Sequence, residues 1–500
     1  MSFLNQSGDL LPFSEVVPAS AQFGAPERSS ILTQRKRARV TPQTGANYGT
    51  SGTSAAGGGN QQIQFLIADA GGMLDLASVV INYNVQTSTA SSATHTKDDG
   101  HPFMTVQILC NGQLLENIQQ APKLANVEMT MAGSKTYYQT AGSLQGWALL
   151  NNDLVTTVPV NANSASSNIT GITAWGFVKG NQPSEAARTS RAAAAVFNQA
   201  IGEQKSIPLG MMCGFGRLKQ YLPLNLVGEI SIVLITGSPQ EVCFTTDSVT
   251  AGDYALQAVN CTYDIVVPDS RYAAVLQKVA MEDPVGLTMP FESSIVSTGA
   301  AIAASATSLS QYDLIVSRAT NHLLRCSVVQ TPTTASTLIG FPSQSCFGHA
   351  GVYSAQFRIG SSVYPQIAAQ GDADLFNMSL AAYGSVMQEN GSVTNRVLWG
   401  NSTNGASAGT AAVFETAEAS SGGTVKFAYG DKFVPSYGFQ VVKGDAEPLA
   451  VDGVSLAGAS GSQLIVSLVA APGVQYTPYV ILTALKFLKA QGGSVSVVGA

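Results

Sequence analysis

Few residues in this 500-residue chain have the types and spacing that catalysis or metal binding requires. The histidines are His95, His101, His322 and His349. None of them stands in an H-E-x-x-H motif or beside a C-x-x-C pair, so the sequence carries no zinc-site signature. No Walker loop, nucleophile elbow or pair of suitably spaced carboxylates stands out either. We therefore expect no enzyme activity, no cofactor, no bound metal and no small-molecule substrate.

Two short segments resemble binding loops but lack essential parts. "TKDDGH" at 96–101 could hold a cation through Asp98 and Asp99, although a solvated loop explains it better. "CGFGRLK" at 213–219 has two glycines and a lysine. It lacks the third glycine of a dinucleotide-binding fingerprint and does not open a helix, so we expect no phosphate site there.

One concentrated basic cluster is the strongest local signal. Only 11% of the chain is charged, whereas soluble domains average about a quarter. Yet "QRKRAR" at 34–39 lies in a short N-terminal stretch with several cations, namely Arg28, Arg35, Lys36, Arg37 and Arg39. Such a cluster can meet nucleic-acid phosphate, an anionic membrane or acidic patches on another subunit, or act as a nuclear import signal. A solubilising tail is the simplest alternative.

The rest of the composition favours a surface that other subunits cover. The hydrophobic fraction is an ordinary 45%, and small polar residues replace the missing charges. Charged residues are depleted at the centres of protein–protein interfaces, so assembly is the preferred interpretation over a lone β protein with a polar surface. The N-terminus shows no signal-peptide pattern, and no run of about 18 apolar residues predicts a membrane span. The dispersed cysteines are expected to be reduced and buried.

Hydrophobic alternation predicts a chain dominated by antiparallel β-structure. Residues 1–60 lack this period and contain "GANYGTSGTSAAGGGN", so they are expected to form a flexible arm. From "QIQFLIAD" onward, strands with period-two patterning follow one another. The predicted helices are few, and they cover 124–134, 184–199, 270–284 and 372–387.

The two halves of the chain resemble each other. "LANVEMTMAGS" at 124–134 and "LFNMSLAAYGS" at 375–385 share Leu, Asn, Gly and Ser at the same offsets. Each follows a strand that ends at a glycine, and each half closes with two long alternating strands. We therefore predict an internal duplication: an arm at 1–60, a first sandwich at 61–268, a linker helix at 269–285 and a second sandwich at 286–500. Each half is long enough for an eight-stranded jelly roll.

With these elements in order, the chain resembles the double-jelly-roll major capsid proteins of adenovirus, tailless membrane-containing phages, polinton-like viruses and virophages. The residues that carry the resemblance are "FLIADAGGMLDLASVVINYNV", "VQILCNGQLLENIQ", "IPLGMMCGFGRLKQYLPLNLVGEISIVL", "YALQAVNCTYDIVVPD", "FRIGSSVYP" and the terminal strand pair. The resemblance covers about 61–500 and implies an all-β fold of two tandem eight-stranded antiparallel jelly rolls with a few short helices.

The resemblance also implies a function. A non-enzymatic capsid subunit of a DNA virus would form a homotrimer with a pseudo-hexagonal footprint and self-assemble into an icosahedral shell. Its partners would be neighbouring capsomers and minor capsid or penton proteins. It would reside in the virion after synthesis in the host cytoplasm, with the nucleus as an alternative site of assembly. The basic arm would face inward and make inter-subunit or internal contacts, with weak, non-specific contact to genome or inner membrane as the lesser alternative. The competing function is a surface receptor- or carbohydrate-binding β-sandwich protein.

Overall fold

The structure of the chain is a computed structural model, and every statement below concerns the residues that it describes. These are residues 3–4, 10–11, 32–45, 47–49, 61–69, 71–87, 94–96, 101–132, 145, 203–218, 220–245, 254–282, 286–303, 309–318, 320–332, 352–383, 418–419, 425–426, 434–439, 453–456, 463–470, 475–491 and 494–498. The "KDDG" part of the predicted cation loop and the predicted 184–199 helix lie outside them.

The first sandwich packs two antiparallel sheets face to face. One sheet has the strand order β10-β6-β14-β3 and the other has the order β5-β12-β8-β9. In chain order its strands are β3 (Leu32–Val40), β5 (Gln62–Ile67), β6 (Met73–Thr87), β8 (Phe103–Cys110), β9 (Gln113–Gln119), β10 (Glu203–Pro208), β12 (Ile230–Thr236) and β14 (Tyr254–Pro268). The short strands β4 (Tyr48–Gly49) and β11 (Leu222–Pro223) extend the first sheet.

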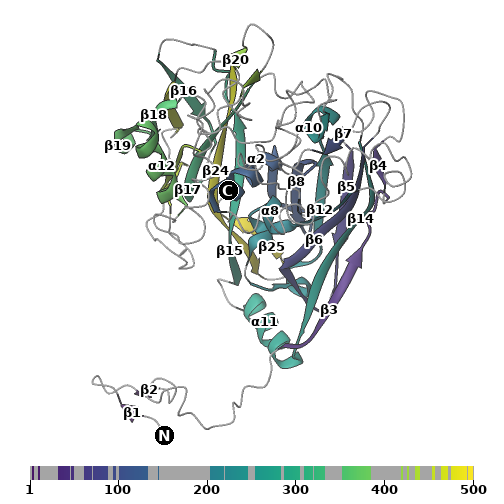
Figure 1. The fold of residues 1–500 in the computed structure, drawn as a ribbon. Coiled ribbons are helices and arrows are strands. Elements are labelled where there is room, and N and C mark those ends of the chain that lie inside the picture. Colours follow the sequence, from purple (N-terminus) through teal and green to yellow (C-terminus); the bar gives the residue numbers. More distant parts are fainter. Residues whose placement is uncertain are drawn as a thin grey trace.

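The second sandwich has the same design. Its sheets have the orders β15-β24-β17-β22 and β16-β23-β18-β19, and β25 (Ser494–Val498) also pairs with β24. In chain order its strands are β15 (Leu287–Thr298), β16 (Ser310–Val316), β17 (Leu323–Pro332), β18 (Val352–Ile359), β19 (Ser362–Gln370), β22 (Ser436–Gly438), β23 (Leu464–Ala470) and β24 (Tyr476–Gln491). Figure 1 shows the two sandwiches side by side, with β15 and β24 between the outer strands of both.

Strand by strand, the two sandwiches match. The eight principal strands of each occupy the same positions in the two sheets when taken in chain order, so β3 corresponds to β15 and β9 to β19. A helix follows the fifth strand in both, α2 (Ala121–Ala132) and α12 (Gly371–Ala382). Two four-stranded sheets with this connectivity form a jelly roll. The predicted fold class, two tandem eight-stranded antiparallel jelly rolls, is confirmed.

The turns repeat as well as the strands. Asn111 and Gly112 both have positive φ between β8 and β9, and Gly360 has positive φ between β18 and β19. Two-residue hairpins favour such residues because their twist matches that of the strands. Gln120 and Gly371, at the junctions between these hairpins and the helices, also share positive φ, at 56° and 74°. The duplication thus extends to individual backbone conformations.

Strand β3 differs from the sequence expectation. The arm was predicted to be flexible through residue 60, but residues 32–40 form the first strand of the first jelly roll. They pair antiparallel with β14, for example Ala38 with Tyr263 and Val40 with Cys261. The strand was missed because "TQRKRARV" shows no apolar alternation. Its core-facing positions are filled by Lys36, Ala38 and Val40, opposite the buried face of β14.

The predicted helix at 270–284 is confirmed as α11 (Ser270–Glu282), which connects β14 to β15. The predicted helices at 124–134 and 372–387 correspond to α2 and α12, each beginning slightly earlier. The remaining short elements are β1 (Phe3–Leu4), β2 (Leu10–Leu11), β7 (Thr94–Thr96), α8 (Leu209–Met212), η2 (Phe215–Arg217), α9 (Leu224–Val227), α10 (Pro239–Val242), β13 (Cys243–Thr245), β20 (Glu418–Ala419) and β21 (Val425–Lys426).

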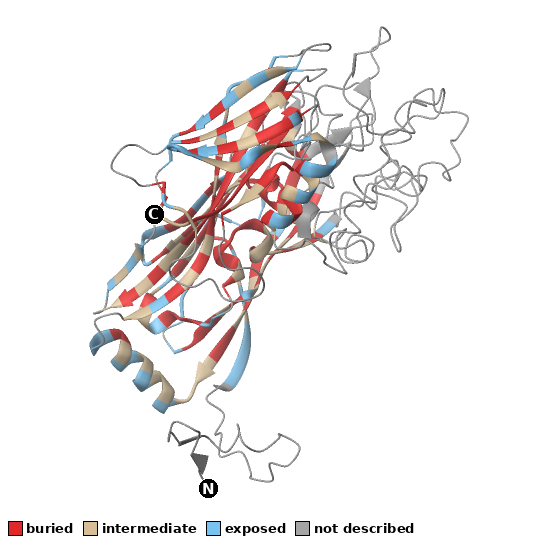
Figure 2. Cartoon of the chain, turned by 90° about the vertical axis from the view of Figure 1, so that its left-hand side faces the viewer, coloured by how far each residue is buried: buried red, intermediate tan, exposed pale blue. Residues whose placement is uncertain are grey.

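Each sandwich buries the inward faces of its sheets, and the buried residues form one continuous core through both (Figure 2). Burial alternates along the strands as the sequence predicts, with Ile63, Phe65 and Ile67 of β5 fully buried. Cys110, Cys213, Cys261 and Cys326 are buried free thiols, in agreement with the expected reduced state of these four.

Candidate functional site: the interface between the two jelly rolls

The two sandwiches meet through a compact loop of the first one. Residues 209–218, which include α8 and η2, lie against β15 of the second sandwich. A Cβ atom on Gly214 would stand 2.1 Å from the backbone oxygen of Glu292, and one on Gly216 would stand 2.6 Å from the backbone nitrogen of Gly210. Only glycine allows backbones to approach so closely. In "CGFGRLK", Gly214 therefore serves close packing between the domains, and Gly216 serves close packing within the loop.

Glu116 of β9 is the polar centre of this interface. Its side chain is 1% exposed, and its carboxylate accepts hydrogen bonds from the backbone N–H groups of Gly214 (3.3 Å), Phe215 (2.9 Å) and Ser294 (3.0 Å). Ser294 belongs to the second jelly roll, so one carboxylate connects both domains. Burial raises the pKa of Glu116, although the three N–H donors and Arg217 act in the opposite direction.

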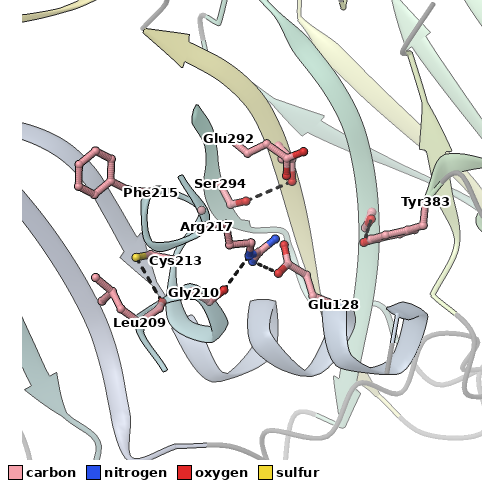
Figure 3. Close-up of polar contacts among 12 residues, drawn as sticks. Glu128, Leu209, Gly210, Cys213, Phe215, Arg217, Glu292, Ser294 and Tyr383 are labelled. Carbon is pink, nitrogen blue, oxygen red and sulfur yellow. Dashed lines mark hydrogen bonds and ion pairs between the residues drawn. The ribbon is translucent and has the colours of Figure 1, made fainter. Parts of the chain in front are cut away.

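Beside Glu116 lies a network of ion pairs, and Figure 3 shows its Arg217 between Glu128 and Gly210. Arg325 of β17 donates to Glu128 of α2 at 3.3 Å and to Glu292 of β15 at 3.0 Å. Arg217 of η2 also pairs with Glu128, and its Nε donates to the backbone oxygen of Gly210. Because Arg325 and Glu128 come from different jelly rolls, the network joins the two domains through charge-assisted hydrogen bonds.

The pKa values in this network follow from burial and pairing. Arg325 and then Arg217 lower the pKa of Glu292, against the opposing effect of burial. Burial lowers the pKa of Arg217 and of Lys486, whose ammonium group donates to the backbone oxygen of Leu115 at 3.5 Å. The acids Glu116, Glu128 and Glu292 thus lie among the bases Arg217, Arg325 and Lys486. Proximity of opposite charges limits the cost of removing them from water.

Apolar and aromatic contacts complete the interface. The rings of Phe215 and Phe291 pack edge to face with centroids 5.2 Å apart, one ring from each domain. The ammonium group of Lys123 lies 4.8 Å from the ring centre of Tyr479, and the guanidinium of Arg325 lies 4.8 Å from that of Tyr383. With packed rings, paired charges and backbone contacts acting together, the interface can hold the sandwiches at a fixed relative orientation.

Sequence reasoning missed this site. It considered "CGFGRLK" only as a phosphate loop and assigned no role to Glu116, Glu128 or Arg325. One signal was present: charge is rare in this chain, and Glu116 interrupts the strand "QLLENIQ". A lone acid in a half-buried strand is expected to have buried partners. Nothing in the sequence identifies those partners, because they lie about 100 and 180 residues away.

The structure separates the predicted basic cluster from this interface. Arg35 pairs with Asp75 at 2.7 Å and with Asp264 at 2.8 Å on the surface of the first jelly roll. Lys36, Arg37 and Arg39 are exposed on β3, and no ion pair within the described part of the chain includes them. Arg28 lies outside the described residues.

Three further features of the described residues bear on the expected chemistry. Among the described residues no group of three or more His, Cys, Asp or Glu side chains could hold a metal ion. No helix in the described ranges is long and apolar enough to cross a bilayer. His101, which follows the predicted cation loop, is buried beside Phe103, and burial lowers its pKa to about 3. A neutral imidazole in contact with a phenyl ring is part of the core.

Two jelly rolls in tandem, fixed to each other by a buried interface, define the double-jelly-roll class of protein. Three solved structures of viral capsid proteins share this fold with the chain. They are the Faustovirus major capsid protein (8% identity, TM-score 0.53, 94% of this chain and 93% of that one), the PBCV-1 virus capsid (12%, 0.52, 96% and 99%), and PBCV-1 VP54 fitted into a reconstruction of the virophage Sputnik (11%, 0.51, 96% and 99%). At these identities the likeness establishes the fold. No protein-family model and no curated protein sequence matches the chain.

Replacing Arg325 by Met is expected to destabilise the interface, because Glu128 and Glu292 lose their shared partner. Breaking a buried ion pair costs about 3–5 kcal/mol, and the lower end, about 3 kcal/mol, applies because Glu292 remains 31% exposed. Urea unfolding at one fixed protein concentration measures the change. The exposed Arg358, which donates only to the backbone oxygen of Gly360, supplies the control substitution Arg358→Met, with an expected change below about 0.5 kcal/mol.

The variant Arg325→Met should also change how the unfolding free energy depends on pH. Arg325 holds the pKa of Glu292 below its usual value, so this carboxylate stabilises the native state above its unfolded pKa of about 4.3. That stability is lost as the pH falls through the lower native pKa. The difference in unfolding free energy between wild type and Arg325→Met should therefore narrow below about pH 4. A constant difference down to pH 2 would contradict the pairing.

Proposed function

We propose that the chain is a viral major capsid protein that works by self-assembly rather than by catalysis. Three copies would form a trimer whose six sandwiches give a pseudo-hexagonal outline, and such trimers would tile an icosahedral shell. The observation that carries this proposal is the rigid pairing of two sandwiches with identical topology in one chain. A chain with two equivalent sandwiches needs only three copies to place six sandwiches in a closed ring.

A charge-free face of the first sandwich supports the proposed lateral contacts. The strands β5, β12, β8 and β9 alternate between core-facing and outward-facing positions. The outward positions carry no ionisable side chain; they are Gln62, Gln64, Leu66, Thr105, Gln107, Leu109, Leu114, Asn117, Gln119, Ser231, Val233 and Ile235. Protein interfaces deplete charge at their centres, so this face suits contact with another protein surface.

The proposal includes a location and partners. The protein would reside in the virion, after synthesis in the host cytoplasm and assembly there or in the nucleus. It would contact neighbouring capsomers and minor capsid or penton proteins. For the basic cluster we propose contact between subunits, with non-specific binding to genome or inner membrane as the lesser alternative, since a few cations on one strand give only weak, salt-sensitive attachment.

Sizing of the purified protein by light scattering, together with negative-stain images, tests the proposal. The expected result is a stable species of about three times the 51.8 kDa chain mass, with a hexagonal outline, or closed particles. A monomer at every concentration would contradict capsid assembly. A monomer that also binds a glycan array would support the competing function of a carbohydrate-binding sandwich.

A further inference from the structure

The contact between the two sandwiches of one chain, here called the junction, predicts the contact between neighbouring chains. Inside the chain, the β9 and α2 side of the first sandwich lies against β15 of the second. Because β19 corresponds to β9, α12 to α2 and β3 to β15, a ring of six equivalent sandwiches would repeat this junction between copies. The β19 and α12 side of one copy would then meet β3 of the next. Figure 1 shows β19 and α12 on the flank opposite to β3, as a ring requires.

The ends of the two fifth strands can be aligned with each other. Gln120 and Gly371 share positive φ, and their strands carry matching buried pairs, Ile118 with Val106 and Ala369 with Ala355. Ile367 precedes Ala369 by two residues, as Glu116 precedes Ile118, but β19 has a register shift here that places residues 365–368 opposite Gln356, whereas Glu116 pairs with Ile108. Glu116 is 1% exposed at the junction, whereas Ile367 is 85% exposed in the single chain. The second sandwich thus leaves a large aliphatic side chain uncovered where the first sandwich contacts its neighbour.

Charge complementarity identifies what covers this surface. The segment from β19 through α12 contains Asp372 and Asp374 and no Lys or Arg. Strand β3 carries Arg37 and Arg39 on its outward face and Lys36 on the other face, and all three are exposed and form no ion pair within the described residues. Opposite charges on two otherwise charge-poor surfaces favour their association and fix its register.

Four charged residues at the contact between the two sandwiches of one chain have the same arrangement of acids and bases. There the β9 and α2 side contributes Glu116 and Glu128, and the sheet that contains β15 contributes Arg325 and Lys486. Between copies the acids again stand on the side of the fifth strand and its helix, and the bases stand on the first sheet. Lys123, Arg217 and Glu292 are exceptions within the chain, since they reverse this order.

We propose that β19 and the start of α12 dock onto β3 of a second copy of this chain, with Ile367 buried in the contact and Asp374 facing the β3 cations. This inference rests on the proposed capsid function and specifies its trimer interface. It assigns the basic cluster to subunit association.

Replacing Ile367 by Asp tests the proposal, because the side chain is exposed and the isolated fold should tolerate the change. We expect an unchanged thermal unfolding midpoint for the monomer fold and trimer dissociation at protein concentrations at least about tenfold higher than for wild type, as for a central interface residue. Ile315→Asp is the matched control. Ile315 is 60% exposed on β16, at the opposite edge of the same sheet, and its replacement should leave the trimer intact.

Cross-linking between copies provides the second test. Chains with Ile367→Cys are mixed with chains that carry cysteine at position 36, 37 or 39, and the mixture is oxidised. At least one of the three positions should give a covalent pair, since a disulfide forms only when Cα atoms approach within about 7 Å. The buried thiols Cys110, Cys213, Cys261 and Cys326 are expected to remain unreacted. All chains also carry Cys243→Ser and Cys346→Ser, so that the two other native cysteines cannot compete.

The outcomes separate this inference from the proposed function. If wild type is trimeric while Ile367→Asp is equally trimeric, or while none of the three cysteine positions cross-links, the docking surface is wrong and the capsid proposal stands. If wild type never forms trimers, the proposed function itself fails. Trimers that persist in Arg37→Glu/Arg39→Glu while polyanion binding is lost would overturn the proposed role of β3 and assign its cations to nucleic acid.

Discussion

Replacing Gly214 by Ala should abolish the fixed orientation of the two jelly rolls. The added Cβ would stand 2.1 Å from the backbone oxygen of Glu292 and 2.8 Å from its backbone carbon. Both atoms belong to a strand backbone, so no flexible side chain can move aside. Either β15 or the 209–218 loop must shift, and the N–H groups of Gly214 and Phe215 then leave the carboxylate of Glu116. We expect a loss of about 3 kcal/mol or more of unfolding free energy, at the upper end of overpacking costs.

Thermal unfolding and light scattering measure this effect. Under the proposed function the variant should also fail to form trimers, because the two sandwiches of each copy would no longer have the orientation that the ring requires. Gly71→Ala is a suitable control, since its added Cβ would have no neighbour closer than 3.7 Å and its backbone needs no positive φ. A Gly214→Ala protein with the wild-type midpoint and wild-type trimers would show that the close approach is not required.

Replacing Glu116 by Ala should have the second large effect. Three buried backbone N–H groups, from Gly214, Phe215 and Ser294, would lose their acceptor at once. Each unsatisfied buried donor costs about 1–3 kcal/mol, and water entering the space can satisfy part of the deficit, so we expect a total of about 3–5 kcal/mol. Lys486 would also lose the nearby charge that favours its ionised form. Urea unfolding measures the free energy lost by Glu116→Ala. The variant Glu229→Ala, which removes an exposed acid, is the control.

The conservative variant Glu116→Gln distinguishes the hydrogen bonds from the charge. It keeps an oxygen acceptor but no ionisable group. Burial raises the native pKa of Glu116 above its unfolded value, so this group favours the native state fully below about pH 4.3 and loses that contribution as the pH rises through the native pKa. The stability advantage of wild type over Glu116→Gln should therefore shrink as the pH rises. An advantage that grows with pH would mean that the carboxylate is stabilised in its ionised form.

Both predictions concern one buried interface, where a chain that is only 11% charged places several acids and bases together. An apolar contact between sandwiches would tolerate sliding, whereas hydrogen bonds and ion pairs require particular positions. In some proteins buried polar groups specify one arrangement at some expense of stability. We propose that the buried polar groups of this chain also specify one arrangement. The angle between the two sandwiches would determine whether three copies close into a ring.

The sequence by itself determined the elements whose cause is local. Alternating apolar residues predict the long strands because side chains of a strand point to opposite faces in turn. A glycine marks the end of the strand before each repeated helix, and Gly112 and Gly360 both have positive φ in the structure. The Leu, Asn, Gly and Ser shared by 124–134 and 375–385, together with the repeated order of strands and helix, predicted two copies of one fold.

Only the tertiary structure decided how distant segments combine. Strand β3 pairs with β14 more than 200 residues away, and its basic residues hide the alternation because the exposed Lys36 stands opposite the buried Ile265, where an apolar residue would be expected. Glu116, Gly214 and Arg325 come from separate segments whose meeting depends on the packing of whole sheets. A sequence pattern records which face of an element is apolar. The identity of the element that covers that face depends on long-range packing, which is why the interface between the jelly rolls became visible only in three dimensions.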